Sequence, residues 1–401
     1  EISACLVGSE MCIRDRDRNG NTIWLNAIGG IGSQHIDDIE AQADGSYIIS
    51  GNIIPEAIFG TITLTTSDRD GYIAKIDQNG EFVWASQIGG ANEQYANQIY
   101  VQADGSSIVK GTFDNEAIFG TTTLTAVAGG WDAYITKIDS NGNFVWAAQV
   151  GGSLSQYIYD VQVQTDGATT ITGANDSDGD MILGDITLSS TGFWGDGYIA
   201  KIDSNGEFVW ANRIGGFGWD NRNIVLQEDD SSIVYGDFRD EPATFGTTTL
   251  TPNGDGTDAY IAKIDSDGNY VWVRQIGGVG NQWVNSDERI QSDGSIILIG
   301  EFGEQAIIGT TTLTAVDGGR DAYITKIDRD GNFVWVSQVG GIDDQEIDRF
   351  RIQDNGSVMV AGNFDKEIVF SQPGLPSQSL IRTSRDGDIY VAKLNPNGIW
   401  E

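Results

Sequence analysis

The side chains of this chain that are best suited to recognition are aromatic. Seven of its eleven tryptophans recur at one position of a repeated segment, so we interpret them as structural. The other four fall between predicted strands, and two tyrosines and the one histidine occupy similar places. Exposed rings beside carboxylates suit stacking against sugars or peptide side chains, although such rings can also simply cover sheet edges. The predicted binding residues are Trp131, Trp194, Trp219, Trp283, Tyr95, Tyr157 and His35.

One segment, NDSDGDMILGD at residues 175–185, concentrates carboxylates where the other repeats carry a more apolar sequence. Oxygen ligands around a glycine turn suit Ca²⁺. The spacing does not match an EF-hand loop, so a solvated acidic loop is the favoured interpretation and a Ca²⁺ site the alternative. The candidate ligands are Asp176, Asp178, Asp180 and Asp185.

A further aspartate precedes a predicted strand once in every period. Six carboxylates at equivalent places could hold cations or a basic ligand. We favour a structural role in which each carboxylate caps its own loop by accepting backbone N–H groups, because the residue is present in every repeat. The six are Asp70, Asp132, Asp196, Asp258, Asp321 and Asp388.

The residues offer little for catalysis. His35 is the single histidine and has no nucleophile or orienting acid at motif spacing, which disfavours Ser-His-Asp chemistry. A pair of carboxylates for glycoside hydrolysis stays open, since acids are abundant and their separations are not visible in a sequence. We therefore predict that the chain is not an enzyme, with an acid-dependent carbohydrate-active enzyme as the alternative.

The charge and composition of the chain limit the kinds of partner that it can bind. The formal net charge is −35, which repels nucleic-acid phosphates and anionic lipid surfaces, so we predict no nucleic-acid partner. No apolar run is long enough to span a membrane, which predicts no membrane insertion. Abundant glycine, scarce proline and the lack of a 3.6-residue apolar period favour many short strands over helices.

The first sixteen residues differ in character from the rest. The stretch LVGSEMCIRDR at residues 6–16 resembles a sequencing adapter translated in frame, so we exclude residues 1–16 from the fold as non-native. Both cysteines, Cys5 and Cys12, fall inside this segment. Residues 17–401 then contain no disulfide, thiolate zinc site or cysteine nucleophile.

From residue 17 onward one unit is repeated. Its clearest mark is a tryptophan that ends an aromatic or β-branched triplet, with gaps of 60 to 65 residues between copies. Six complete periods are present, with partial repeats at both ends. The marker residues are Trp24, Trp84, Trp146, Trp210, Trp272, Trp335 and Trp400.

The sequence pattern within each period predicts four antiparallel strands. In the second period we place strand a near residues 99–102, strand b at 107–110, strand c at 132–139 and strand d at 144–150. Turns of the ADGS and DSNG kind join a to b and c to d, because Asp or Asn bonds local amides and Gly takes the left-handed conformation. The longer b to c connection carries FGTTTLT. The d to a and b to c connections share one end of the sheet.

Four-stranded sheets repeated six times cannot bury both faces alone and must stack on their neighbours. Radial stacking of such sheets gives an all-β propeller, with the marker tryptophans filling the wedges between blades. The run DAYITKIDSNGNFVWAAQVGG, followed by DGS and a VxG or IxG strand, resembles the bacterial seven-bladed β-propeller repeat across residues 17–401. This resemblance implies an extracellular or cell-surface setting.

We therefore expect a non-catalytic surface propeller that binds carbohydrate or protein through its variable loops and belongs to a longer multi-domain chain. A structural spacer within an adhesin-like protein is a further alternative.

Overall fold

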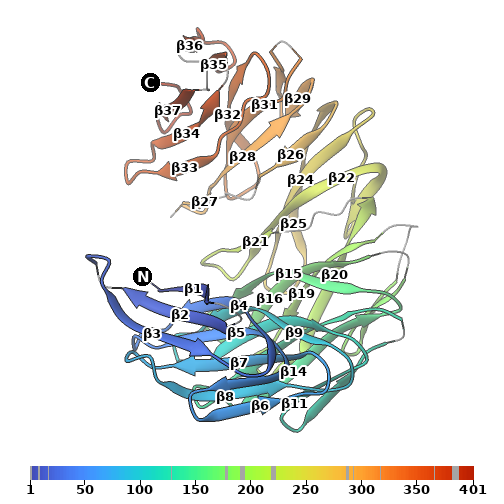
Figure 1. The fold of residues 1–401 in the computed structure, drawn as a ribbon. Helices are drawn as coiled ribbons and strands as arrows, with labels where there is room; N and C mark the ends of the chain where they lie inside the picture. Colours follow the sequence, from blue (N-terminus) through green and yellow to red (C-terminus); the bar gives the residue numbers. More distant parts are fainter. Residues whose placement is uncertain are drawn as a thin grey trace. The chain divides into compact units, whose positions relative to one another are not determined.

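The computed structural model describes residues 2–7, 10–16, 18–127, 129–176, 179–189, 195–217, 223–285, 289–291, 293–316, 318–364, 366–381 and 388–401, with the backbone alone at 2–7, 10–12, 14 and 215–217. Within these residues the chain is all-β, and its strand pairs are antiparallel. None of the described segments forms a helix that could cross a membrane. The chain divides into two compact units, residues 1–193 with 200–211 and residues 194–199 with 212–401 (Figure 1).

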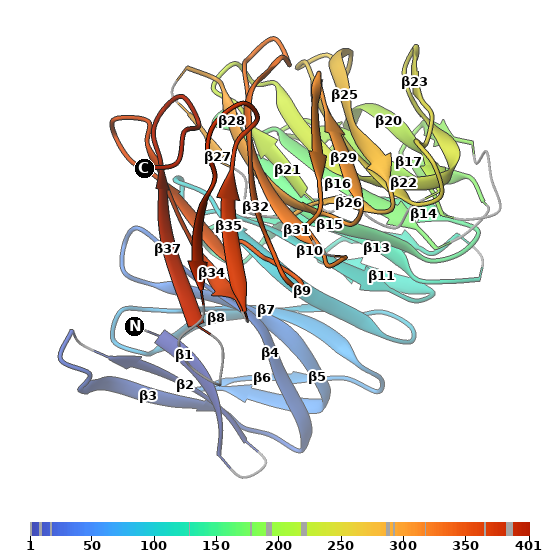
Figure 2. The ribbon, with the colours of Figure 1, turned by 90° about the horizontal axis from the view of Figure 1, so that it is seen from above.

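The predicted four-stranded repeat is confirmed in the structure. In the second repeat, β9 (Gln94–Val101), β10 (Ser107–Phe113), β13 (Asp132–Ile138) and β14 (Phe144–Gly152) pair in the order a, b, c, d. The first repeat follows the same order, and Figure 2 shows its strands side by side. These are β4 (Gly32–Ala41), β5 (Tyr47–Phe59), β7 (Asp70–Ile76) and β8 (Phe82–Ile88).

The later repeats keep this order, although strand a of the fifth is divided into two strands and the described part of the sixth has only an isolated bridge at Trp400 in place of strand d. The third has β15 (Gln156–Val163), β16 (Thr169–Asn175), β19 (Gly197–Ile202) and β20 (Phe208–Phe217), and the fourth β21 (Asn223–Leu226), β22 (Ser232–Phe245), β24 (Thr257–Ile264) and β25 (Tyr270–Val279). The fifth has β26 (Gln282–Val284), β27 (Arg289–Ile290), β28 (Ile296–Phe302), β31 (Asp321–Ile327) and β32 (Phe333–Gly341), and the sixth β33 (Arg349–Ile352), β34 (Val358–Phe364) and β37 (Asp388–Leu394).

The b to c connection is not the open loop that the sequence predicts. It forms a two-stranded hairpin, and that hairpin pairs with strand d of the preceding repeat, as in Val150↔Leu183 and Ile276↔Ile308. Strand d would otherwise have an unpaired edge, and the hairpin covers it. The hairpins are formed by β5 with β6 (Ile62–Thr65), β11 (Glu116–Phe119) with β12 (Thr122–Thr125), β17 (Met181–Leu183) with β18 (Ile186–Leu188), β22 with β23 (Thr248–Leu250), β29 (Gln305–Ile308) with β30 (Thr311–Thr314), and β35 (Glu367–Ser371) with β36 (Gln378–Ile381).

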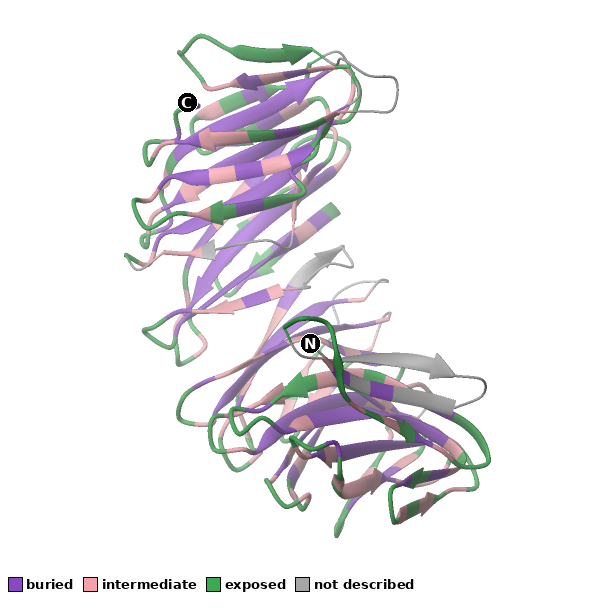
Figure 3. Ribbon diagram, turned by 60° about the vertical axis from the view of Figure 1, so that its left-hand side comes forward, coloured by how far each residue is buried: buried purple, intermediate pink, exposed green. Residues whose placement is uncertain are grey.

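Strands b and c are buried on both faces, including polar residues such as Lys110 and Thr136. β10 and β13 expose almost none of their side chains, and Figure 3 shows the buried segments along the strands with exposed segments at the turns. The core between the first two repeats combines Ile48 and Ile73 of one with Val109 and Phe113 of the next. Such a core cannot form within a single repeat.

Five of the seven marker tryptophans pack against the glycine of the next c to d turn, which is the predicted wedge role; they are Trp24, Trp84, Trp146, Trp272 and Trp335. Trp84 donates from its indole Nε1 to the Ser140 carbonyl at 3.0 Å, and Trp272 donates to the Arg329 carbonyl at 3.1 Å. A Cβ atom on Gly142 would lie 2.7 Å from the Trp84 ring. Glycine is therefore required at this turn position for two reasons: its φ of 87° is unfavourable for other residues, and a side chain would collide with the Trp84 ring.

Residues 2–16 form β1 (Ile2–Val7) and β2 (Glu10–Arg16), and β2 pairs with β3 (Thr22–Ile28), which is strand d of the first partial repeat. The non-native origin of this segment stays a prediction.

Two turn glycines, one in contact with a tryptophan ring and one without, allow the tryptophan contact to be tested with an internal control. Gly20 occupies the same turn position with φ 84°, but no ring lies within 4 Å of its Cβ position. We predict that Gly20→Ala costs about 1 kcal/mol through its backbone alone, whereas Gly142→Ala costs about 1–3 kcal/mol more because Trp84 must move. Urea unfolding measures both. Equal losses would contradict the wedge.

Candidate functional site

Of the described candidates, Tyr95, Tyr157, Trp283 and His35 lie near the start of strand a rather than in the preceding loop, whereas Trp131 directly precedes strand c. Strand a begins earlier than the sequence predicts, so that Tyr95, Tyr157 and Trp283 are each the second residue of β9, β15 and β26. His35 lies near the start of β4 and is exposed, while the other three are partly buried. Trp194, Trp219 and Asp178 lie outside the described residues.

The backbone at this position is held by two residues of the same repeat. The buried Tyr134 of strand c donates its hydroxyl hydrogen to the Tyr95 carbonyl at 2.7 Å, and Tyr323 does the same to the Trp283 carbonyl at 2.8 Å. A Cβ atom on Gly111 of strand b would lie 1.9 Å from the Tyr95 carbonyl oxygen. The glycine of strand b thus lets strand a approach closely enough for this hydrogen bond.

In the N-terminal unit these elements bring a cation and two rings together. The Arg69 guanidinium lies 5.4 Å from the Tyr95 ring centroid and donates to its hydroxyl at 2.6 Å. The Trp131 ring centroid is 5.6 Å from that of Tyr95, with the planes tilted by 58°. The Tyr95 hydroxyl donates to Glu93 at 3.0 Å. We call Arg69, Tyr95 and Trp131 the aromatic cluster.

In the C-terminal unit an arginine also lies over an aromatic ring, but this arginine is surrounded by carboxylates. The Arg320 guanidinium lies 5.9 Å from the Trp283 ring centroid. It also forms ion pairs with Glu301 at 2.9 Å, Asp344 at 3.0 Å and Glu346 at 3.5 Å. These carboxylates already satisfy the arginine, so the pair forms a closed network rather than an open binding surface.

The remaining predicted residues form smaller contacts. The Tyr157 hydroxyl donates to Asp176 at 3.3 Å, and its ring stacks with Tyr159 at a centroid distance of 6.4 Å. His35 and Arg69 are close enough to Asp37 for their charges to lower its pKa, but burial has the larger effect and the net pKa of Asp37 is raised.

Three of the six aspartates before strand c are capping residues of the predicted kind. Asp132 accepts the Val127 amide at 2.9 Å, Asp258 accepts the Asn253 amide at 2.8 Å, and Asp321 accepts the Val316 amide at 3.0 Å. A strand d glutamine donates to each carboxylate. All three are fully buried, so they offer no open face to a ligand. Asp70 instead accepts from the Thr66 hydroxyl, and Asp196 pairs with Arg213.

The acidic segment at residues 175–185 is distributed over different elements. Asp176 follows β16, and Asp185 lies in the turn between β17 and β18. Within the described part of the chain, no three His, Cys, Asp or Glu residues are grouped to hold a metal ion. Calcium binding by this segment therefore stays a prediction, and one of its four candidate ligands, Asp178, lies outside the described residues.

Lys110 is a buried lysine with a lowered pKa, a property that nucleophilic lysines can also have. It is 8% exposed and donates to the carbonyls of Ile158 at 3.0 Å and Tyr159 at 2.5 Å in the next repeat. Burial lowers its pKa to about 8. Its protons are used to hold the bulge of β15, which favours a structural role over a nucleophilic one.

Arg69 and Glu93 are site residues that sequence reasoning missed. Their signal is positional: Arg69 directly precedes the capping Asp70, at the place where Trp131 precedes Asp132.

The comparisons with known proteins are consistent with a repeat chain but assign no family. No family model matches the chain. It is 26% identical over 208 residues to an uncharacterised WD repeat-containing protein of Acanthamoeba polyphaga mimivirus, covering 44% of this chain and 15% of that protein. It is 21% identical over 363 residues to the regulatory protein FlaEY of Caulobacter vibrioides, covering 84% and 36%. The chain thus spans about a third or less of these relatives.

Among solved structures, the chain is similar to a rhamnogalacturonan lyase at 9% identity and a TM-score of 0.32, covering 100% of this chain and 74% of that one. A protein of unknown function from Bacteroides caccae has 9% identity and a TM-score of 0.32, with coverage of 84% and 92%. Neither score reaches 0.5, so neither structure bears on the function.

The buried caps predict a pH dependence. Burial raises the pKa of Asp132 and of Asp321 to about 6, partly opposed by their hydrogen bonds. The folded protein then holds protons that the unfolded chain releases, so the free energy of unfolding should fall as pH rises from about 4 to about 6, by up to about 3 kcal/mol per group.

Urea unfolding across this pH range tests the prediction. Asp132→Asn should flatten the slope, while the exposed turn variant Asp267→Asn should leave it unchanged. An Asp132→Asn slope equal to that of the wild type would show that Asp132 ionises normally.

Proposed function

We propose that this chain is a non-catalytic β-propeller, extracellular or attached to a cell surface, that binds carbohydrate through the aromatic cluster. The proposed propeller is supported by the repeats themselves. Within each unit, every sheet is linked to its neighbour by a tryptophan wedge and by a hairpin that covers strand d. Sheets that are joined in this way rotate steadily about an axis, which is the geometry of a propeller.

The observation that carries the binding proposal is the arrangement of Tyr95 and Trp131. Both rings are partly buried and lie at one end of a rigid sheet. Arg69 donates a hydrogen bond to the Tyr95 hydroxyl, and Tyr134 donates one to the Tyr95 backbone carbonyl, so both the side chain and the backbone of Tyr95 are held in place. Preorganised rings lose little conformational entropy on binding, and sugar rings stack their C–H faces on such surfaces.

Polar groups around these rings suit hydroxyl-rich ligands. Arg69 carries donors beyond the one used on Tyr95, and Glu93 supplies acceptors beside the same hydroxyl. A saccharide that is stacked on Tyr95 or Trp131 would find both kinds of partner within the same cluster. The strongly acidic surface is consistent with an extracellular setting and argues against polyanionic partners.

A glycan array tests the proposal with Trp131→Ala and a matched control, Val145→Ala. Val145 is 56% exposed on strand d of the same unit and lies outside the cluster. We expect wild type and Val145→Ala to bind the same glycans, and Trp131→Ala to lose about tenfold in affinity, the value of roughly 1.4 kcal/mol for one stacked ring.

Two results would contradict the proposal. Undiminished binding by Trp131→Ala would place recognition elsewhere on the protein. The absence of binding in all three forms would favour the structural spacer.

A further inference from the structure

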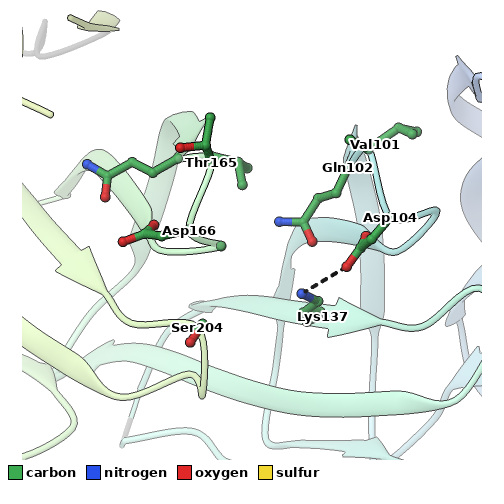
Figure 4. Close-up of a pocket in the computed structure, with 11 residues that line it drawn as sticks. Val101, Gln102, Asp104, Lys137, Thr165, Asp166 and Ser204 are labelled. Atoms are coloured by element: carbon green, nitrogen blue, oxygen red, sulfur yellow. Dashed lines mark ion pairs between the residues drawn. The ribbon is translucent and has the colours of Figure 1, made fainter. Parts of the chain in front are cut away.

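A second candidate site lies at the other end of the N-terminal unit's repeats, where the a to b turns emerge. A cavity of about 430 Å³ separates the turns of the second and third repeats. This volume falls within the range of small-molecule pockets, roughly 300–1,000 Å³. Figure 4 shows Gln102, Asp104 and Lys137 facing Thr165 and Asp166 across the cavity, with Ser204 on a neighbouring turn.

The carboxylate of Asp166 lacks the partners that its equivalents have. In four other repeats, the turn aspartate forms an ion pair with a strand c lysine and accepts a hydrogen bond from a serine hydroxyl. The ion pairs are Lys75–Asp44 at 3.4 Å, Lys137–Asp104 at 3.9 Å, Lys263–Asp229 at 3.1 Å and Lys326–Asp293 at 3.5 Å. The serines are Ser46, Ser106, Ser231 and Ser295.

In the third repeat Ala168 replaces the serine, and the equivalent lysine, Lys201, forms no ion pair with Asp166 among the described residues. The Ala168 amide, at 2.9 Å, is the donor that the structure gives to Asp166. An exposed carboxylate therefore faces the cavity without the ammonium group that neutralises it in the other repeats.

The cavity is open because a bridge between neighbouring turns is missing. Gln42 donates to the Gly105 carbonyl at 3.0 Å, and Gln227 donates to the Gly294 carbonyl at 3.2 Å. No such bond joins Gln102 to Gly167 in the part of the chain that the structure describes. The cavity beside Gln227 measures about 160 Å³, well below the 430 Å³ beside Gln102.

Gln164 adds a second unsatisfied group to the lining. It is 4% exposed, and both its amide nitrogen and its oxygen lack hydrogen-bond partners. The serine that donates to this glutamine in other repeats is again the one replaced by Ala168. Buried amides without partners are costly, so they favour a polar occupant.

We propose that this cavity binds a small hydroxyl-rich ligand carrying a protonated primary amine, of which an amino sugar is the simplest form. The ligand's ammonium takes the place beside Asp166 that a lysine ammonium takes in the other repeats. Its hydroxyls bond to the Gln102 amide and to the Thr165 and Ser204 hydroxyls. This site is separate from the aromatic cluster and does not rest on the proposed function.

Isothermal titration with glucosamine, N-acetylglucosamine and glucose at about pH 6, where the amine is protonated, tests the assignment. We expect glucosamine to bind at one site at least tenfold more tightly than the two neutral sugars, and more weakly as salt is added. Asp166→Asn should weaken glucosamine binding about tenfold. Ala168→Ser, which restores the hydroxyl of the other repeats, should also weaken it.

Matched controls separate this site from general attraction to an acidic surface. Asp293→Asn changes the equivalent carboxylate in the C-terminal unit, which Lys326 already neutralises, and should leave binding unchanged. Trp131→Ala should also have no effect. Equal binding of glucosamine and N-acetylglucosamine, unchanged binding by Asp166→Asn, or no binding of glucosamine would each overturn the proposal.

Discussion

The structure depends on one recurring contact, in which a tryptophan of one repeat packs against the turn glycine of the next. The indole fills the wedge between sheets, and its N–H satisfies a turn carbonyl that would otherwise lack a protein partner. Removing such a ring would cost about 3–5 kcal/mol, which is a large part of the stability of a typical domain. The indole therefore helps to set the spacing of neighbouring repeats.

That spacing determines the geometry at both ends of the N-terminal repeats. At one end, neighbouring strands bring Arg69 of one repeat over Tyr95 of the next. At the other end, the turns lie close enough for Gln42 to reach Gly105, but the junction at Gln102 stays open. The second candidate site thus arises where one repeat departs from the shared pattern. The capping aspartates Asp132, Asp258 and Asp321, by contrast, occupy equivalent positions in their repeats and serve the fold.

The sequence predicted the fold well because its signals are local and repeated. The turn motifs, the Gly pairs and the tryptophan spacing identify strands a to d, and the capping role of Asp132, Asp258 and Asp321 follows from their recurrence. It did not predict that the strand leading into FGTTTLT pairs with the preceding repeat, because that contact joins strands whose residues lie about 30 apart in sequence. The strand a boundary was also wrong, since pairing with strand b extends strand a to Gln94, which lies opposite Phe113.

The candidate sites were less predictable than the fold. Tyr95 and Trp131 were identified by type, but their contact and the role of Arg69 depend on the stacking of neighbouring repeats. Asp166 could have been found by comparing the repeats with one another, because Ala168 interrupts a serine that recurs at that position. What no single repeat reveals is which of the shared hydrogen bonds fails to form, since that depends on two neighbouring turns at once.

The most direct measurement of the central contact is hydrogen exchange at the indole N–H groups, followed by NMR. Trp84, Trp146, Trp272 and Trp335 should exchange slowly, at rates governed by large-scale unfolding, because each donates to a carbonyl of the next repeat. The partly buried Trp131 should exchange much faster. Fast exchange at all four wedge residues would show that neighbouring repeats are not joined by their indoles and that another contact sets their spacing.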